Sequence, residues 1–369
     1  MCYFYKIIFT YKKKFISIFF LLLISIIINY YYPNNTKIKK TKDFPNYKYN
    51  QVNSFYPKAK NFKLNYNKKC GEIFKYKPNN KKDLVILAYE FQNRNFRHNL
   101  FIEIAIEKVL DSYKNSIPNA YFICFVPKKS INTKIVKKIK KYNIEIIEIS
   151  NSNQHITNRR FIEAYKYLKE KKNNFERVLH IDIDDIYIFG DIFATIGEND
   201  LYVNYNCNIE STKLERCRLF FKSANKKWFQ KNINKYNSKE REIKNFKRKK
   251  PLTIIAGVFV GGIKNFYKFI ELYSQKLLQF NNKNQMRNFG YDQILFNYLY
   301  YNEYFKQINL KVIGCEQRMC FRPRNLLFNK KTTKIIYENS RCSPILIHKG
   351  YPNSWISLES KYLKKFNSL

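Results

Sequence analysis

From residue 81 onward, short apolar runs alternate with longer segments whose apolar residues recur at helical spacing. The short runs have the length of buried strands, and the longer segments have the period of amphipathic helices. The expected strands are DLVILAYE, AYFICFV, NIEIIEIS and RVLHIDIDD, and the expected helices are HNLFIEIAIEKVLDSY, NTKIVKKIKKY and NRRFIEAYKYLKEKK. This alternation predicts an α/β domain with a central, mostly parallel, doubly wound sheet and helices on both faces.

The alternation becomes less regular after RVLHIDIDD. Residues 206–250 are rich in Lys and Asn and read as a basic excursion, which we interpret as an acceptor lid, a disulfide loop or disorder. Beyond it, the pattern predicts two helices, residues 264–280 and GYDQILFNYLYYNEYF, and three strands, LTIIAGVFVGGI, LKVIG and PILIH. One domain over residues 81–369 accounts for these elements.

The amino-terminal part of the chain predicts a membrane anchor. Residues 15–32 carry no charge, and their length is at the lower limit for crossing a bilayer. A cleavable signal peptide is the competing interpretation, but no small-x-small cleavage pattern follows the apolar run. We therefore expect a short cytosolic tail at 1–14, an uncleaved transmembrane signal anchor at 15–32, and a polar stem or linker at 33–80.

Charge and cysteine content add two constraints. The chain has 69 Lys and Arg against 28 Asp and Glu, a formal net charge of +41. Such a charge attracts anions, but Lys is spread along the whole chain with Asn, Ile, Tyr and Phe, which favours a compositional bias. No recognition helix or zinc-finger spacing is present, so no nucleic-acid partner is expected. Of the eight cysteines, Cys2 would be cytosolic and Cys124 a buried thiol. The other six suit lumenal disulfides of undetermined pairing.

Three carboxylates, Asp182, Asp184 and Asp185, interrupt the apolar run RVLHIDIDDIYIFGDIF. Carboxylates are rarely buried without a partner, and ligands of open α/β sheets bind beyond the carboxyl ends of the strands. In an ideal strand Asp182 and Asp184 share a face, where they would suit Mn²⁺ or Mg²⁺ together with phosphate oxygens. If the chain turns first, Asp185 joins the site and Asp184 leaves it. The simpler alternative is that these acids cap a turn or pair with lysines.

Several motifs in order make the chain resemble glycosyltransferases of the GT-A type, which use nucleotide-diphospho-sugars. The motifs span about residues 83–355 and read RRFIEAYKYL, RVLHIDIDD, GDIF, AGVFVGG, DQILFN and ILIHKGYPNSW. The resemblance implies a GT-A-like catalytic domain with a divalent cation on the acidic motif. It also implies transfer of a hexose or pentose to a glycan or glycoprotein acceptor.

The resemblance also implies roles for single residues. His348 would be a third metal ligand, with a strand-end histidine as the alternative, and Lys349 would reach the diphosphate. Asp292 would act as the general base, with a helix N-cap as the alternative. The remaining donor-site residues are Gln293 and the glycines Gly257, Gly261 and Gly262, for which a bulge or tight turn is the alternative. Arg159 and Arg160 would hold phosphate or lie on a solvated helix face, and for Arg160 we favour the solvated face.

The combined expectation is a type II, single-pass, metal-dependent glycosyltransferase with its domain in the lumen of the Golgi or endoplasmic reticulum. A catalytically inactive, membrane-anchored binding or scaffold protein with the same fold is the alternative. The pattern leaves open the donor nucleotide and sugar, the acceptor, the oligomeric state, and whether the reaction retains or inverts the anomeric centre.

Overall fold

The computed structural model describes residues 64–65, 68–91, 96–205, 252–279, 290–314, 319–321, 326–329, 334–337 and 342–348. All of them belong to one compact unit, Phe55–Leu369. The expected cytosolic tail, the anchor at 15–32 and the excursion at 206–250 lie outside the described residues. Within the described ranges, no helix combines the length and the apolarity needed to cross a membrane.

A seven-stranded sheet forms the centre of the domain, in the order β3-β2-β1-β4-β7-β6-β8. Neighbouring strands pair in parallel except where β7 pairs with β4 and with β6, so the sheet is mostly parallel as predicted. The strands are β1 (Asp83–Ala88), β2 (Tyr121–Pro127), β3 (Glu145–Ile149), β4 (Arg177–Ile181), β6 (Leu201–Tyr205), β7 (Ile254–Gly262) and β8 (Leu310–Ile313).

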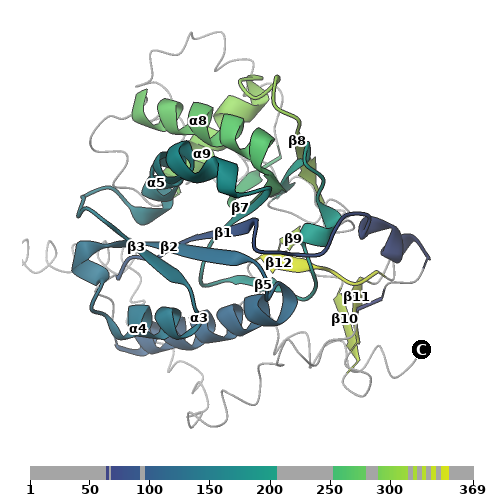
Figure 1. The fold of residues 1–369 in the computed structure, drawn as a ribbon, viewed down its shortest axis with the longest axis horizontal. Helices are drawn as coiled ribbons and strands as arrows, with labels where there is room; N and C mark the ends of the chain where they lie inside the picture. Colours follow the sequence, from purple (N-terminus) through teal and green to yellow (C-terminus); the bar gives the residue numbers. More distant parts are fainter. Residues whose placement is uncertain are drawn as a thin grey trace, which may run out of the picture. The chain divides into compact units, whose positions relative to one another are not determined.

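Helices cover both faces of this sheet (Figure 1). One face packs on α3 (Phe96–Ser116) and α4 (Lys134–Lys141), and the other on α5 (Ile156–Lys171), α8 (Ile263–Gln279) and α9 (Tyr291–Tyr301). Each central strand contributes alternate side chains to two apolar cores: Leu179 of β4 enters the first core and Val178 the second. Strands buried on both faces read as continuous apolar runs, which is why the sequence pattern found them.

The connections reverse direction between β1 and β4. From β1 the chain passes through α3 to β2 and through α4 to β3, and α5 then returns it past β1 to β4 on the opposite face. Such a topological switch point opens a crevice at the carboxyl ends of the two strands, where open α/β sheets bind ligands. The acidic motif follows β4 directly, so the fold brings it to this crevice.

Two smaller sheets accompany the main one. A three-stranded sheet has the order β5-β12-β9, and β10 pairs with β11 in an antiparallel ribbon. Their strands are β5 (Ile186–Ile188), β9 (Met319–Phe321), β10 (Leu326–Asn329), β11 (Lys334–Tyr337) and β12 (Leu346–His348). Four 3-10 helices are also described: η2 (Lys68–Ile73), η3 (Lys128–Ser130), η4 (Lys172–Asn174) and η5 (Phe193–Thr195). The sequence pattern predicted β12 but not β5 or β9.

A buried ion pair fixes the amino end of β4 to β1. The Arg177 guanidinium donates two hydrogen bonds to Asp83, from Nε to Oδ1 at 2.6 Å and from Nη2 to Oδ2 at 2.7 Å. Its other donors reach the carbonyl oxygens of Lys77, Pro78 and Phe193. Residues 68–80, which the pattern assigns to the linker, therefore pack on the domain, because their carbonyl groups satisfy a buried arginine.

Candidate metal centre at the carboxyl edge of the sheet

The acidic motif leaves the strand earlier than an ideal alternation implies. β4 ends at Ile181, the chain bends through residues 183–185, and β5 begins at Ile186. The Asp182 amide donates to the carbonyl oxygen of Gly257 at 3.1 Å, which ties the bend to β7. Because of this bend Asp185 is buried, with 2 % of its surface exposed, whereas Asp184 is exposed. Of the two alternatives, the structure therefore has the one in which Asp185 takes the inward position.

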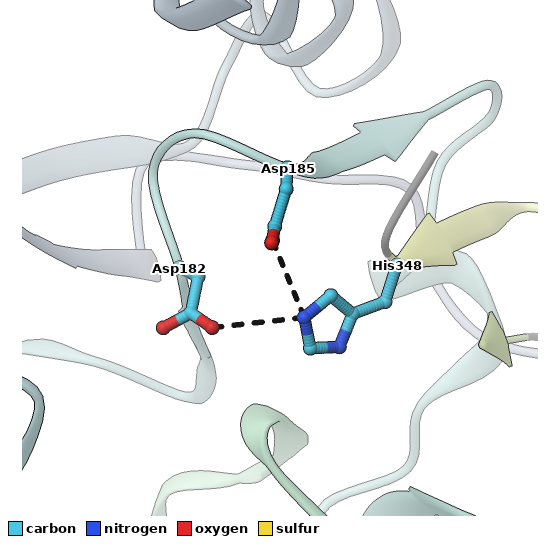
Figure 2. A group of neighbouring side chains, drawn as sticks. All are labelled: Asp182, Asp185 and His348. Carbon is cyan, nitrogen blue, oxygen red and sulfur yellow. Dashed lines mark ion pairs between the residues drawn. The ribbon is translucent and has the colours of Figure 1, made fainter. Parts of the chain in front are cut away.

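His348 reaches the same place from the far end of the chain. It is the last residue of β12, which pairs antiparallel with β5 so that His348 lies opposite Ile186, the neighbour of Asp185. The imidazole Nε2 is 3.2 Å from Asp185 Oδ1 and 3.6 Å from Asp182 Oδ2 (Figure 2). One ligand atom from each of the three residues lies within 4.8 Å of the others.

The donor set of this cluster fits a divalent cation. Adjacent ligands of an octahedral ion with bonds of 2.0–2.1 Å lie about 3 Å apart, close to the two distances from His348 Nε2. Two carboxylates and one imidazole are common metal ligands, and three protein ligands leave positions for water or phosphate oxygens. The donor set does not distinguish Mn²⁺ from Mg²⁺. Asp184 does not belong to the cluster, and Lys349 lies outside the described residues.

Gly257 closes one side of the cluster. A Cβ at this position of β7 would meet the Cε1 atom of His348 and the Oδ2 atom of Asp182, both closer than atoms can approach. The absence of a side chain at Gly257 therefore lets Asp182 and His348 occupy their places. The sequence analysis assigned Gly257 to the donor site, and in the structure this glycine lies against Asp182 and His348 of the candidate cluster.

Gly261 and Gly262 lie at the other end of β7 and need a different explanation. They pair with Val178 and Arg177 at the amino end of β4, away from the acidic motif. A Cβ on either glycine would meet the backbone of Glu198, Asp200 or Leu201. Their expected role at the donor site is corrected: they allow the segment before β6 to pack closely on β7.

Arg160 is the site residue that the sequence analysis misjudged. The expectation of a solvated helix face is wrong, because the side chain has 4 % of its surface exposed. Its guanidinium forms an ion pair with Asp182, lies 3.2 Å from Asp292 Oδ2, and donates to the Ala256 carbonyl at 2.8 Å. Helical periodicity carries no sign of this burial. The available signal was position, since Arg160 lies in the first turns of a helix that starts at the carboxyl edge of the sheet.

Arg159 is buried as well, but it does not join the cluster. Its exposed fraction is 2 %, and Nη2 donates to the Ser150 carbonyl at 2.8 Å and lies 3.4 Å from Glu163 Oε1. These contacts hold the start of α5 to the end of β3. A phosphate-binding role for Arg159 gains no support from its position.

Asp292 lies beyond Arg160, on the second residue of α9. The N-cap position belongs to Gly290, whose φ of 80° is left-handed, so Asp292 is not the cap. The Asp292 backbone amide donates a hydrogen bond to Asn158 Oδ1 at 2.9 Å. Burial raises the pKa of the Asp292 carboxyl, and Arg160 opposes that rise. A buried carboxyl with a raised pKa is suited to proton transfer, which keeps Asp292 a candidate base.

Asn297 of the DQILFN motif has a structural role in this geometry. The Asn297 side chain accepts from the Ile254 amide and donates to the Ile254 carbonyl, both at 2.8 Å, so it fixes α9 to the start of β7. It also donates to the Gln293 carbonyl at 2.6 Å. Gln293 itself is half-buried, and its side chain has no described contact with the acidic cluster.

Tyr113 is a further residue that sequence reasoning missed. It lies on α3 and is fully buried, and its hydroxyl donates to the Asp182 carbonyl at 3.3 Å. The acidic bend is thus held from both faces of the sheet, by α3 and by α5.

No known family model matches this chain, and no curated protein matches it either.

Proposed function

We propose that the protein is a metal-dependent glycosyltransferase that takes a sugar from a nucleotide-diphospho-sugar. The observation that carries the proposal is the meeting of Asp182, Asp185 and His348 at the carboxyl end of β4, beside the topological switch point. An oxygen-rich divalent site at this position suits a diphosphate, and the order of motifs resembles GT-A-type transferases.

The residues of the cluster have distinct tasks in this proposal. Asp182, Asp185 and His348 would hold Mn²⁺ or Mg²⁺, which when bound would stabilise the negative charge of the departing nucleoside diphosphate. Arg160 fixes one oxygen of Asp182 and leaves the other directed toward His348. The same guanidinium lies against Asp292, which we assign to the acceptor hydroxyl as general base. Lys349 and Gln293 remain assigned to the diphosphate and the donor.

The acceptor and the compartment follow from the same proposal. A glycan or glycoprotein in the lumen of the Golgi or endoplasmic reticulum is the acceptor, and residues 15–32 anchor the chain. Support comes from the disulfide between Cys70 and Cys342, because disulfides persist in oxidising compartments such as the secretory lumen. Cys124 is a buried free thiol, as the sequence predicted, and takes no part in this chemistry.

Ligand-dependent thermal stability of the purified full-length chain tests the proposal. Unfolding would be followed in buffer, with Mn²⁺, and with Mn²⁺ plus each of a panel of nucleoside diphosphates. A ligand at 100 times its dissociation constant adds about 2.7 kcal/mol to the free energy of unfolding. We expect a Mn²⁺-dependent rise with one nucleotide base, which is lost in Asp182→Asn and Asp185→Asn.

Asp184→Asn is the matched control, since Asp184 is an exposed acid in the same bend. This variant is expected to keep the Mn²⁺-dependent rise. A folded protein that no nucleotide stabilises, with or without metal, contradicts the proposal. Nucleotide binding without release of nucleoside diphosphate from any nucleotide-sugar supports the alternative, an inactive binding or scaffold protein.

A further inference from the structure

His348 lies at the end of a very short strand. Its strand, β12, has three residues and lies between β5 and β9, outside the seven-stranded sheet. Asp182 is different, because it directly follows β4, a central strand of the main sheet, and Asp185 lies only three residues further along the same bend. A metal ligand has to be held to within about 0.5 Å of its productive place. Something besides three residues of strand pairing has to fix the segment that carries His348.

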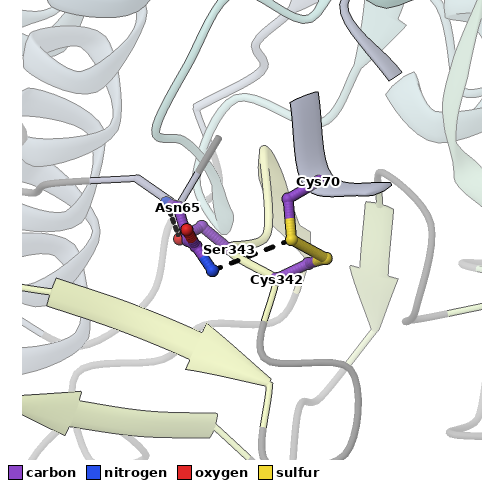
Figure 3. The surroundings of a disulfide bond; sticks show 4 residues. All are labelled: Asn65, Cys70, Cys342 and Ser343. Carbon is purple, nitrogen blue, oxygen red and sulfur yellow. Dashed lines mark hydrogen bonds between the residues drawn. A yellow bond between two sulfur atoms is a disulfide. The ribbon is translucent and has the colours of Figure 1, made fainter. Parts of the chain in front are cut away.

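The segment before β12 is tethered where it enters the domain. Cys342 forms a disulfide with Cys70 of η2, and the next residue, Ser343, accepts a hydrogen bond from the Asn65 amide at 2.6 Å. The Asn65 side chain also lies 3.7 Å from Cys70 Sγ, so the disulfide and the hydrogen bond tie the same two segments of the chain together (Figure 3). The disulfide joins residues 272 positions apart, and the Asn65–Ser343 hydrogen bond joins residues 278 positions apart.

Between the tether and His348 the chain has little freedom. Ser343, Ile345, Leu346 and Ile347 each have at most 4 % of their surface exposed, and the Ile345 carbonyl accepts from the Phe189 amide at 2.7 Å. A displacement at Cys342 is therefore transmitted along a packed segment rather than absorbed by a solvated loop. A shift of the imidazole relative to Asp185 follows from it.

We propose that the Cys70–Cys342 disulfide is a positioning element for His348, and that the metal site reaches its full affinity only when this bond is formed. The inference rests on the proposed function, since it assumes that His348 is a metal ligand. Cys70 and Cys342 touch no reacting atom. Their effect passes through the register of β12 against β5 and so through the distance from His348 Nε2 to Asp185.

The test is a Mn²⁺ titration of the full-length chain, with free Mn²⁺ read by electron paramagnetic resonance. We expect the double variant Cys70→Ser/Cys342→Ser to bind Mn²⁺ at least about tenfold more weakly than the wild type, as when a supporting contact of a metal ligand is removed. In a His348→Ala background, the same double change is expected to leave the remaining Mn²⁺ affinity unaltered, because the tether acts through His348.

A purely structural role of the disulfide predicts a different result. The unfolding temperature would then fall while the Mn²⁺ affinity of the folded protein stayed at the wild-type value, and that outcome overturns the inference. Gly262→Ala is the control for general destabilisation, since its Cβ would press on the Glu198 backbone at the opposite end of β7. It is expected to lower the unfolding temperature without weakening Mn²⁺ binding.

Two further outcomes are decisive. If the double Ser variant does not fold, the folded wild-type chain takes its place after reduction of the disulfide with dithiothreitol, alkylation of the freed thiols and removal of the reductant, because this treatment breaks the same bond without a substitution. Weaker Mn²⁺ binding by the reduced and alkylated chain supports the inference, and unchanged binding overturns it. A wild-type chain that binds no Mn²⁺ contradicts the metal site itself, and with it the proposed function. Equal binding by the wild type and the folded disulfide variant contradicts only the positioning role.

Discussion

Adding one methyl group at Gly257 should weaken metal binding more than any change at the other glycines of the same strand. In Gly257→Ala the new Cβ would lie 2.5 Å from Asp182 Oδ2 and would also overlap the ring of His348. Ordinary contact begins at 3.4 Å, so the carboxylate or the strand has to move by about 0.9 Å. Metal–ligand distances tolerate about 0.2 Å, so the cluster cannot keep its geometry.

The expected size of the effect follows from two terms. Overpacking of this kind typically costs about 1–3 kcal/mol in the free energy of unfolding. Displacing the support of a metal ligand typically costs about 10–100-fold in metal affinity, and Gly257 lies against two of the three candidate ligands. We therefore expect a loss of Mn²⁺ affinity near the upper end of that range, with a modest loss of stability.

Gly261→Ala is the matched comparison, because its Cβ would meet the Leu201 Cα at 2.8 Å rather than the acidic cluster. Both variants would be titrated with Mn²⁺ by electron paramagnetic resonance and unfolded by heat. Gly261→Ala is expected to lose stability while its Mn²⁺ affinity stays within about twofold of the wild type, a change below about 0.4 kcal/mol. Equal Mn²⁺ affinity of folded Gly257→Ala and wild type would refute the reasoning.

Three further outcomes are expected. Arg160→Gln should lower the free energy of unfolding by about 3–5 kcal/mol, because it leaves the buried Asp292 carboxylate without its cation; adding Asp292→Asn should recover part of that loss in a double-mutant cycle by chemical denaturation. Arg177→Met should cost a similar amount in the same assay, since it leaves the buried carboxylate of Asp83 without its cation. Because this pair lies at the far end of β4, Mn²⁺ affinity should stay unchanged. Burial raises the pKa of Glu103, but its bonds to Lys138 and a second lysine outweigh burial and leave that pKa below its ordinary value. The stabilisation is therefore complete above the unfolded pKa of about 4.3 and is lost as the pH falls through the native value, so Glu103→Gln should cost about 0.5–1 kcal/mol at pH 7 and progressively less as the pH falls below about 4.3.

The helices and most strands of the main sheet were readable because both faces of the sheet are buried, but β6 was not among the predicted strands. Continuous apolar runs mark β1, β2, β4 and β7, and helical spacing marks the segments between them. The antiparallel direction of β7 was not readable, since a buried strand has the same composition in either direction. The short strand β5 was absorbed into the apolar run that surrounds the acidic motif.

The site was predictable only in part, for two physical reasons. Alternation of faces holds only inside a strand, and β4 ends at Ile181, so the sequence left open which of Asp184 and Asp185 points inward. Periodicity also says which face of a helix is apolar, not which polar residues another element covers. Arg160 is buried because α5 begins where β7 and α9 meet, and only the three-dimensional arrangement shows this.

The distance along the chain between the two acids and His348 sets an order of assembly. A ribosome delivers strands β1 to β4 and the acidic bend long before it delivers β12, whereas a domain generally folds as one unit. The candidate cluster can therefore be completed only after the segment from Cys342 to His348 has been made. A chain cut short before β12 contains every strand of the main sheet and still lacks one of the three candidate metal ligands.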